Sequence, residues 1–143
     1  MRALGVDLGS VRIGLAVSDR SGTLASPHSV LTRGRRRSDD HAAIARIVGE
    51  EDIEIVVVGL PVNMDGSEGP AARAARDEGT DIATVVGVPL VFSDERRTTV
   101  AAEGSLRERG VHGSRRRQSV DKVAAAFILQ GWLDSRDRGA SGT

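Results

Sequence analysis

The sequence predicts an α/β domain built on a mixed five-stranded sheet, with helices on both faces. Three observations predict it. Three apolar strands separated by glycine turns open the chain, two more apolar runs follow, and segments with helical spacing alternate with these runs. The chain has 143 residues, of which 39% are hydrophobic, so it can bury roughly two thirds of its unfolded surface. We expect one domain over residues 1–134 and a flexible polar tail over 135–143.

The three opening strands are expected to form an antiparallel meander, joined by turns at Gly9-Ser10 and Ser21-Gly22. They cover residues 2–8, 11–18 and 23–31. Pro27 has no amide proton to donate, which places the third strand at an edge of the sheet.

Helices and two parallel strands are expected to follow the meander. Residues 55–58 are continuously apolar, as in a parallel strand that is covered on both faces. Residues 123–129 are apolar all round, so we expect their helix to be buried against the sheet. The expected elements are a helix from Ser38, a strand at 53–58, a helix from Pro70, a strand at 90–93, a helix at 99–109, a basic loop up to Arg117 and a helix at 119–133.

Composition limits the possible chemistry. The chain has no cysteine, which excludes disulfides and thiolate metal sites and leaves oxygen and imidazole ligands. Any metal is then expected to be a hard cation such as Mg²⁺ or Mn²⁺. No apolar run is long enough to span a bilayer, and Asp7 interrupts the stretch where a signal peptide would need apolar residues. We therefore expect a cytoplasmic protein without membrane contact.

Arginine carries almost all the positive charge, in two clusters, although the formal net charge is zero. The clusters are Arg33, Arg35, Arg36 and Arg37, and Arg107, Arg109, Arg115, Arg116 and Arg117. Guanidinium groups in glycine-containing loops suit phosphate backbones. On charge alone, solvated surface loops are the slightly better interpretation.

Asp7 is the strongest functional candidate, because an ionised carboxylate inside a strand is costly unless a partner meets it. The possible partners are a divalent metal, backbone amides of the next turn, or an arginine brought in by the fold. Further acids stand at the exit of the fifth strand, Asp94 and Glu95, and in the first turn of the last helix, Asp121. Such carboxylates can clamp two hard cations for phosphodiester hydrolysis.

The other acids also have structural explanations. Asp121 would favour a helix start, Asp94 could cap the following helix, and Glu95 could pair with Arg96 or Arg97. The sequence offers no Ser, Cys or His in the setting of a nucleophile.

Four segments of the chain resemble the YqgF family, the nucleases that mature the small-subunit ribosomal RNA precursor and relatives of the RuvC Holliday junction resolvases. They are Val6-Asp7-Leu8-Gly9 through Asp19; Val58-Gly59-Leu60-Pro61 with 63–67; Asp94-Glu95-Arg96 with Thr98-Thr99; and Val120-Asp121 with Ala124-Ala125 and 128–130. They occur in family order and cover most of the chain.

The resemblance implies a ribonuclease H-like fold and a metal-dependent endonuclease, with a two-metal-ion mechanism. Asp7, Glu95 and Asp121 would hold Mg²⁺ or Mn²⁺, with Asp94 as the competitor for the middle position. The implied substrate is structured nucleic acid, most directly the 5′ end of pre-16S rRNA, and the alternative is branched DNA. The implied substrate contacts are Arg12, Asn63, Ser67, Arg96, Arg97, Arg115, Arg116 and Arg117.

The chain departs from the family pattern at three places. No acid stands on the strand at 56–59, so the middle ligand must come from Asp94-Glu95. Arg97 replaces a common leucine and adds charge near the proposed site. Glu78-Gly79 replaces a common aromatic residue, which we expect to loosen packing.

Several interpretations stay open at this point. The loop at 60–69 fits either an ordinary turn or a phosphate site at a helix start. His28, His41 and His112 have no ligand spacing and are expected at the surface. A non-catalytic ribosome- or nucleic-acid-associated factor is the main rival function, a nucleotide-dependent phosphotransferase is a weaker one, and both a monomer and a homodimer are possible.

Overall fold

The computed structural model describes the backbone of residues 1–97 and 113–141 and the side chains of residues 1–96 and 122–136. Its centre is a five-stranded sheet with the order β3-β2-β1-β4-β5. The strands are β1 (Ala3–Leu8), β2 (Arg12–Ser18), β3 (Ala25–Thr32), β4 (Ile55–Leu60) and β5 (Leu90–Asp94). β1, β2 and β3 pair antiparallel, whereas β4 pairs parallel with β1 and β5. This confirms the predicted mixed sheet.

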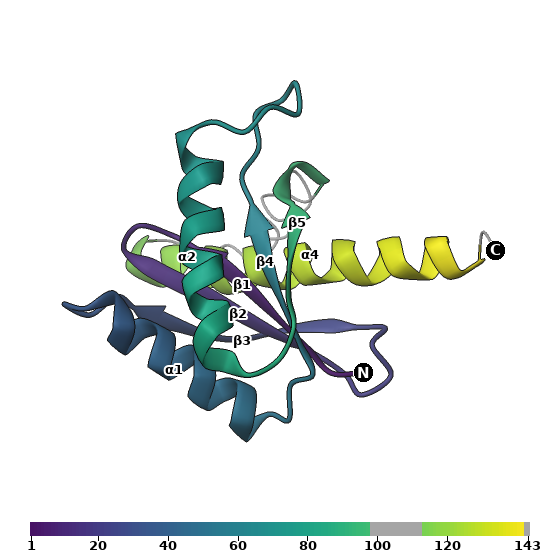
Figure 1. Ribbon diagram of the computed structural model, residues 1–143, viewed down its shortest axis with the longest axis horizontal. Coiled ribbons are helices and arrows are strands. Elements are labelled where there is room, and N and C mark those ends of the chain that lie inside the picture. The colour runs from purple at the N-terminus through teal and green to yellow at the C-terminus, as the bar shows by residue number, and fades with distance from the viewer. Residues whose placement is uncertain (98–112, 142–143) are drawn as a thin grey trace.

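Helices cover both faces of the sheet, as predicted (Figure 1). They are α1 (Arg37–Glu50), α2 (Pro70–Val86) and α4 (Gly113–Ser141), and the short 3-10 helix η1 (Glu95–Arg97) follows β5. The predicted helix at 99–109 lies outside the described residues. Within the described ranges, no helix combines the length and the apolar composition needed to cross a membrane.

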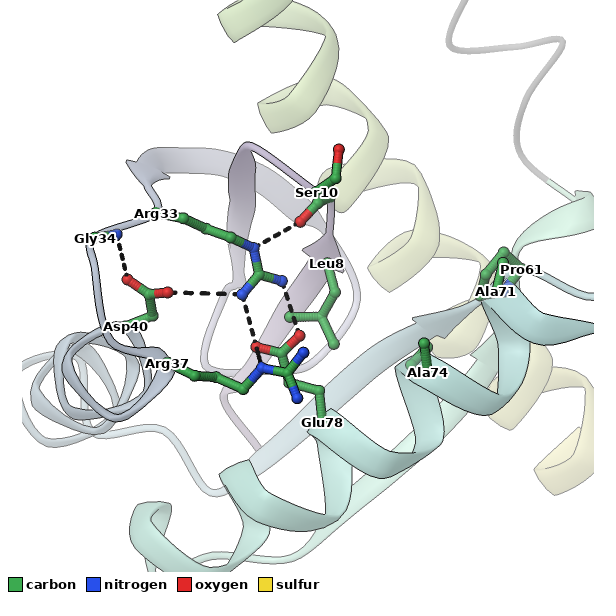
Figure 2. Close-up of a pocket in the computed structure, with 12 residues that line it drawn as sticks. Leu8, Ser10, Arg33, Gly34, Arg37, Asp40, Pro61, Ala71, Ala74 and Glu78 are labelled. Carbon is green, nitrogen blue, oxygen red and sulfur yellow. Dashed lines mark hydrogen bonds and ion pairs between the residues drawn. The ribbon is translucent and has the colours of Figure 1, made fainter.

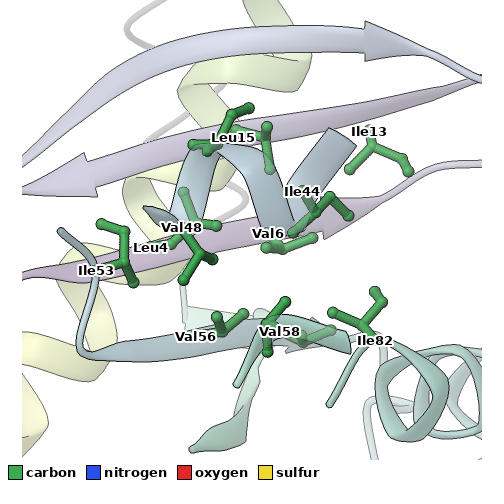
Figure 3. Close-up of a cluster of buried hydrophobic side chains, with 12 residues drawn as sticks. Leu4, Val6, Ile13, Leu15, Ile44, Val48, Ile53, Val56, Val58 and Ile82 are labelled. Atoms are coloured by element: carbon green, nitrogen blue, oxygen red, sulfur yellow. The ribbon is translucent and has the colours of Figure 1, made fainter. Parts of the chain in front are cut away.

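Side chains that alternate along the strands fill two separate cores. On one face, Val56 and Val58 pack with Ile44 of α1 and Ile82 of α2 (Figure 3). On the other face, Val57 packs with Leu129 and its neighbours on α4. The continuous apolar run of β4 is therefore explained by burial on both sides.

The third strand is an edge strand, as Pro27 predicted. The pairing of β2 with β3 shifts between Leu15 and Ala16, where Leu15 pairs with Ser29 and Ala16 pairs with Pro27. This irregularity twists the edge, which helps to prevent strands of other molecules from pairing with it.

The last helix is longer than predicted at both ends. The basic segment before Ser119, predicted as a loop, forms the start of α4, which begins at Gly113. Arginine and glutamine are good helix formers, and no proline interrupts them. At the other end, the helix continues through Ser141 rather than ending near Leu133, and its last turns extend beyond the sheet (Figure 1). Arg136 stacks on Trp132 one turn earlier, at 4.8 Å from the ring centre.

Candidate active site

Asp7 lies near the end of β1 on the α4 side of the sheet. Gly5, two residues earlier on the same face, packs directly on α4: a Cβ atom there would lie 2.8 Å from the carbonyl oxygen of Ala125. The intervening Val6, like Leu8, joins the opposite core under α1 and α2, because alternate residues of a strand face opposite sides. The fold therefore places the Asp7 carboxylate between the sheet and α4, where it is only partly exposed.

Glycines in the neighbouring strands leave space beside Asp7. Gly14 pairs with Asp7 in β2, and the register places Gly59 beside it in β4. Glu95 fills part of this space: a Cβ atom on Gly59 would lie 3.0 Å from both Cγ and Oε1 of Glu95. Glu95 thus reaches Asp7 across β4, at the one position of β4 that has no side chain. This geometry accounts for the missing acid on β4.

The Asp7 and Glu95 carboxyl groups are in hydrogen-bonding contact, which shifts a pKa. The pKa of Glu95 is raised to about 7: burial is the largest cause, the charge of Asp7 is next, and the hydrogen bond with Asp7 and the charge of Asp94 add to it. Two carboxylates this close cannot both ionise without cost. The pair therefore either shares a proton or requires a cation beside it.

Asp94 is engaged by Arg96 instead. Its Oδ2 accepts hydrogen bonds from Nε and Nη2 of Arg96 at 2.9 and 2.6 Å, and its Oδ1 accepts one from the Arg96 backbone amide at 2.9 Å. Arg96 also donates from Nη1 to the carbonyl oxygen of Met64 at 3.1 Å. Of the two acids at the end of β5, Glu95 is therefore the one that contacts Asp7.

Only the backbone of the third predicted ligand, Asp121, is described. Residue 121 lies on α4, one helical turn before Ala125, which packs on Gly5. Among the side chains that are described, no group of three His, Cys, Asp or Glu residues could hold a metal ion. The described part of the molecule thus brings together two of the predicted ligands, Asp7 and Glu95.

Asn63 and Ser67, predicted substrate contacts, bond to one another in the loop between β4 and α2. Asn63 Nδ2 donates to Ser67 Oγ at 2.9 Å, and Ser67 Oγ donates to Asp65 Oδ1 at 2.6 Å. The hydrogen bonds that Asp65 accepts from the hydroxyl group and the backbone amide of Ser67 lower the pKa of Asp65. Gly66 has φ 89, a left-handed conformation that glycine adopts without strain. The loop, which is held by these internal hydrogen bonds, extends past the end of β4 (Figure 1).

A comparison with protein families matches residues 1–135 to the model described as "RuvX: Holliday junction resolvase". The chain belongs to the RuvX family. A relative named "Putative pre-16S rRNA nuclease" in Anaeromyxobacter dehalogenans (strain 2CP-C) is 50% identical over 137 residues, which cover 95% of this chain and 98% of the relative. A relative of the same name in Myxococcus xanthus (strain DK1622) is 47% identical, over 94% of this chain and 89% of the relative. The predicted resemblance to this group is confirmed.

The fold of this RuvX family member is also that of RuvC. The structure described as "T. thermophilus RuvC in complex with Holliday junction substrate" aligns over 96% of both chains with a TM-score of 0.61 and 20% sequence identity. At this identity the likeness concerns the fold, and it confirms the ribonuclease H-like architecture.

A buried ion network near the turn after β1 was missed by the sequence interpretation. Arg33 donates from Nη1 and Nη2 to the two carboxylate oxygens of Glu78 at 2.9 and 2.8 Å, and from Nε to the Gly9 carbonyl oxygen at 2.7 Å. Asp40 lies 3.6 Å from Arg33 Nη1. Arg33 was interpreted as part of a solvated or phosphate-binding loop, but its side chain is only 17% exposed. In this RuvX protein it is a buried cross-link between α1, α2 and the turn.

Two further expectations about the α2 side of the sheet were wrong. His41 was expected at the surface, but it is buried and its Nε2 lies 2.8 Å from Glu78 Oε2. Gly79 was expected to loosen packing, but a Cβ atom there would lie 2.6 Å from the Phe92 ring, so glycine is required for tight packing. One sequence signal was available: Glu78 falls on the apolar face of α2, and a buried carboxylate needs cationic partners.

The remaining predicted residues are placed only in part. His28 lies at the surface on the edge strand β3, with its side chain 27% exposed and its Nε2 3.1 Å from Glu51 Oε1. Arg12 is the first residue of β2 and is half-buried. His112 and the side chains of Arg97, Arg115, Arg116 and Arg117 lie outside the described part of the chain.

Proposed function

We propose that this protein is a cytoplasmic, metal-dependent endonuclease that cleaves structured nucleic acid, with the 5′ end of pre-16S rRNA as its substrate. The family, and the name shared by relatives that match nearly the whole chain, support the nuclease activity and this substrate. The observation that carries the proposal is the contact between the Asp7 and Glu95 carboxyl groups beside Gly59.

The carboxyl pair fits a divalent metal ion. Its donors are oxygens in a partly buried site, and its own electrostatics already force a proton onto Glu95 near neutral pH. A hard cation such as Mg²⁺ or Mn²⁺ would offset the same repulsion. Asp7, Glu95 and Asp121 would hold the metal. When bound, it would activate water and stabilise negative charge on the phosphate.

The residues around this pair have separate tasks in the proposed mechanism. Asp7 and Glu95 provide the negative charge, and both must be ionised to do so. Arg96 neutralises Asp94 and keeps it out of the pair. Because Arg96 also holds the carbonyl oxygen of Met64, it fixes the 61–69 loop relative to Glu95. We propose that Arg96 acts mainly by positioning this loop.

Substrate phosphates are proposed to contact residues around this edge of the sheet. Guanidinium groups bind phosphate oxygens through paired hydrogen bonds. The proposed contacts are Arg12, Asn63, Ser67, Arg97, Arg115, Arg116 and Arg117.

Branched DNA is the second candidate substrate. The RuvX family carries the description of a Holliday junction resolvase, which favours it. A resolvase would be expected to act as a homodimer on a two-fold symmetric junction, whereas RNA maturation needs only a monomer.

The decisive experiment compares the unmodified protein with Asp7→Asn on ribosomal RNA precursor and on four-way DNA junctions. We expect Mg²⁺- or Mn²⁺-dependent cleavage by the unmodified protein, abolished by chelator and by Asp7→Asn, with substrate binding retained. Asp77→Asn on the exposed side of α2 is the matched control and should cleave normally. Binding without cleavage of either substrate by the unmodified protein would support the non-catalytic factor instead.

A further inference from the structure

A pocket of about 590 Å³ opens on the sheet face opposite Asp7. It lies between the turn after β1, the segment leading into α1, and α2 (Figure 2). Ligand sites for small molecules typically enclose 300–1,000 Å³. The pocket therefore has room for a ligand the size of one nucleotide.

The charged side chains at the floor of the pocket are already paired with one another. Glu78, with only 4% of its surface exposed, accepts two hydrogen bonds from Arg33 and lies 2.8 Å from His41. Arg33 is in turn fixed to the Gly9 carbonyl oxygen. Because these charges satisfy one another, a ligand need not rearrange the floor, and the pocket is preformed.

An exposed arginine stands at the mouth of the pocket. The Arg37 side chain is 57% exposed, and its Nε lies 3.8 Å from Glu78 Oε2, which is longer than a hydrogen bond. Arg35 and Arg36, the two preceding residues, are exposed as well. Among the residues that line the pocket, Asp40 and Glu78 offset the charges of Arg33 and Arg37, so Arg37, the more exposed of the two cations, is the group that a phosphate can reach.

The wall along α2 is small and apolar. Ala71 and Ala74 of α2 line it together with Pro61, the residue after β4 (Figure 2). An apolar surface of this kind suits the face of a base or a sugar. One side of the pocket thus offers an exposed guanidinium group to a phosphate, and another side is apolar.

The pocket adjoins the candidate active site at the end of the sheet where β1 and β4 finish. Leu8 and Gly9, which line the pocket, directly follow Asp7 in the chain. Pro61 stands two residues after Gly59, beside which Glu95 lies. A strand that passes over this edge could contact the carboxyl pair on one face and the pocket on the other.

We propose that this pocket holds one unpaired nucleotide of the substrate strand, with its phosphate at Arg37 and its base or sugar against Ala71 and Ala74. This inference rests on the proposed function, because it takes the substrate to be nucleic acid. Proteins that recognise RNA by sequence commonly bind single-stranded loops and ends whose bases are unstacked. The pocket would select a substrate with an unpaired nucleotide near the scissile bond.

The test uses one variant that fills the pocket and a second variant that removes the positive charge of Arg37. Ala74→Phe places a ring in the pocket, and Ala83→Phe, at another exposed position of α2, is its matched control. Arg37→Gln removes the charge at the mouth, and Arg46→Gln, exposed near the other end of α1, is the control for it. Thermal unfolding of all four variants checks that each is folded.

Binding is measured by fluorescence anisotropy in chelator, so that no cleavage occurs, with RNA that carries 2-aminopurine at single unpaired positions. We expect Ala74→Phe to bind about tenfold more weakly. At one unpaired position, the change in 2-aminopurine fluorescence that the unmodified protein causes on binding should be lost with this variant. Arg37→Gln should lower the salt dependence by about one phosphate contact. Both control variants should bind like the unmodified protein.

Equal binding by Ala74→Phe and Ala83→Phe, with an unchanged salt dependence for Arg37→Gln, would overturn the pocket assignment. Titration with free nucleoside monophosphates distinguishes the source of the nucleotide. If these bind in the pocket while Ala74→Phe leaves strand binding unchanged, the strand assignment is wrong. Because binding is measured without cleavage, an inactive protein that still shows the pocket effects would refute only the nuclease proposal.

Discussion

Replacing Glu95 by glutamine should stabilise the metal-free protein at alkaline pH. The folded state raises the pKa of Glu95 from 4.5 to about 7, chiefly through burial and then through the charge of Asp7. Between these two values the folded protein keeps a proton that the unfolded chain has lost. The free energy of unfolding therefore falls as pH rises from about 4.5 through about 7 and then levels off.

The size of the effect follows from the shift. A difference of about 2.5 pKa units corresponds to a ceiling of about 3 kcal/mol above pH 8. Asp7 shares the repulsion and residual solvent screens it, so we expect about 1–3 kcal/mol. For a domain of this size, that range is roughly 3–10 °C in melting temperature. Glutamine stays neutral, so Glu95→Gln should escape the loss.

The assay is thermal and urea unfolding from pH 4.5 to pH 8.5 in chelator. The difference between Glu95→Gln and the unmodified protein should be small at pH 4.5 and largest at pH 8.5, whereas Glu50→Gln, on the exposed end of α1, should show no such trend. Adding Mg²⁺ at pH 8.5 should stabilise the unmodified protein more than the variant. Parallel pH profiles for Glu95→Gln and the unmodified protein would refute the carboxyl-pair argument.

Two further predictions concern the α2 side of the sheet. Glu78→Ala leaves the buried Arg33 guanidinium without its main partner, so urea unfolding should show a loss of about 3–5 kcal/mol; a loss below 1 kcal/mol would contradict the buried network. Gly79→Ala should cost about 1–3 kcal/mol, because its methyl group would lie 2.6 Å from the Phe92 ring. Gly49→Ala meets nothing within 4 Å in α1 and should be neutral or slightly stabilising, and equal effects of the two substitutions would contradict the packing argument.

The sheet could be predicted from the sequence because it depends on local patterns, whereas the grouping of Asp7 with Glu95 was implied by the family resemblance. Glycine turns and strand-length apolar runs identified all five strands, and Pro27 identified an edge. The cost of burying Asp7 indicated that it needs a partner. The predicted parallel strands indicated that their carboxyl ends lie together at one end of the sheet. The identity of that partner as Glu95 depended on Gly59, whose role is visible only once β5 is seen beside β4.

The apolar face of α2 indicated that Glu78 is buried, but its partners could not be predicted because they lie on distant segments. Arg33 looked like a member of a surface arginine cluster, and nothing local shows that it turns inward to meet Glu78, 45 residues later. The limits of α4 were missed for a different reason. Its first and last turns are polar, so helical periodicity of apolar residues carries no signal there.

Gly5 allows the close approach between β1 and α4, the helix that carries the proposed metal ligand Asp121. Because Gly5 has no side chain, the backbone of α4 packs directly on β1. The distance between β1 and the helix that carries Asp121 is therefore the shortest that the two backbones allow. A single methyl group at this position would push α4 away from β1. We therefore expect a Gly5 variant that still folds to lose activity, although Gly5 itself has no reactive group.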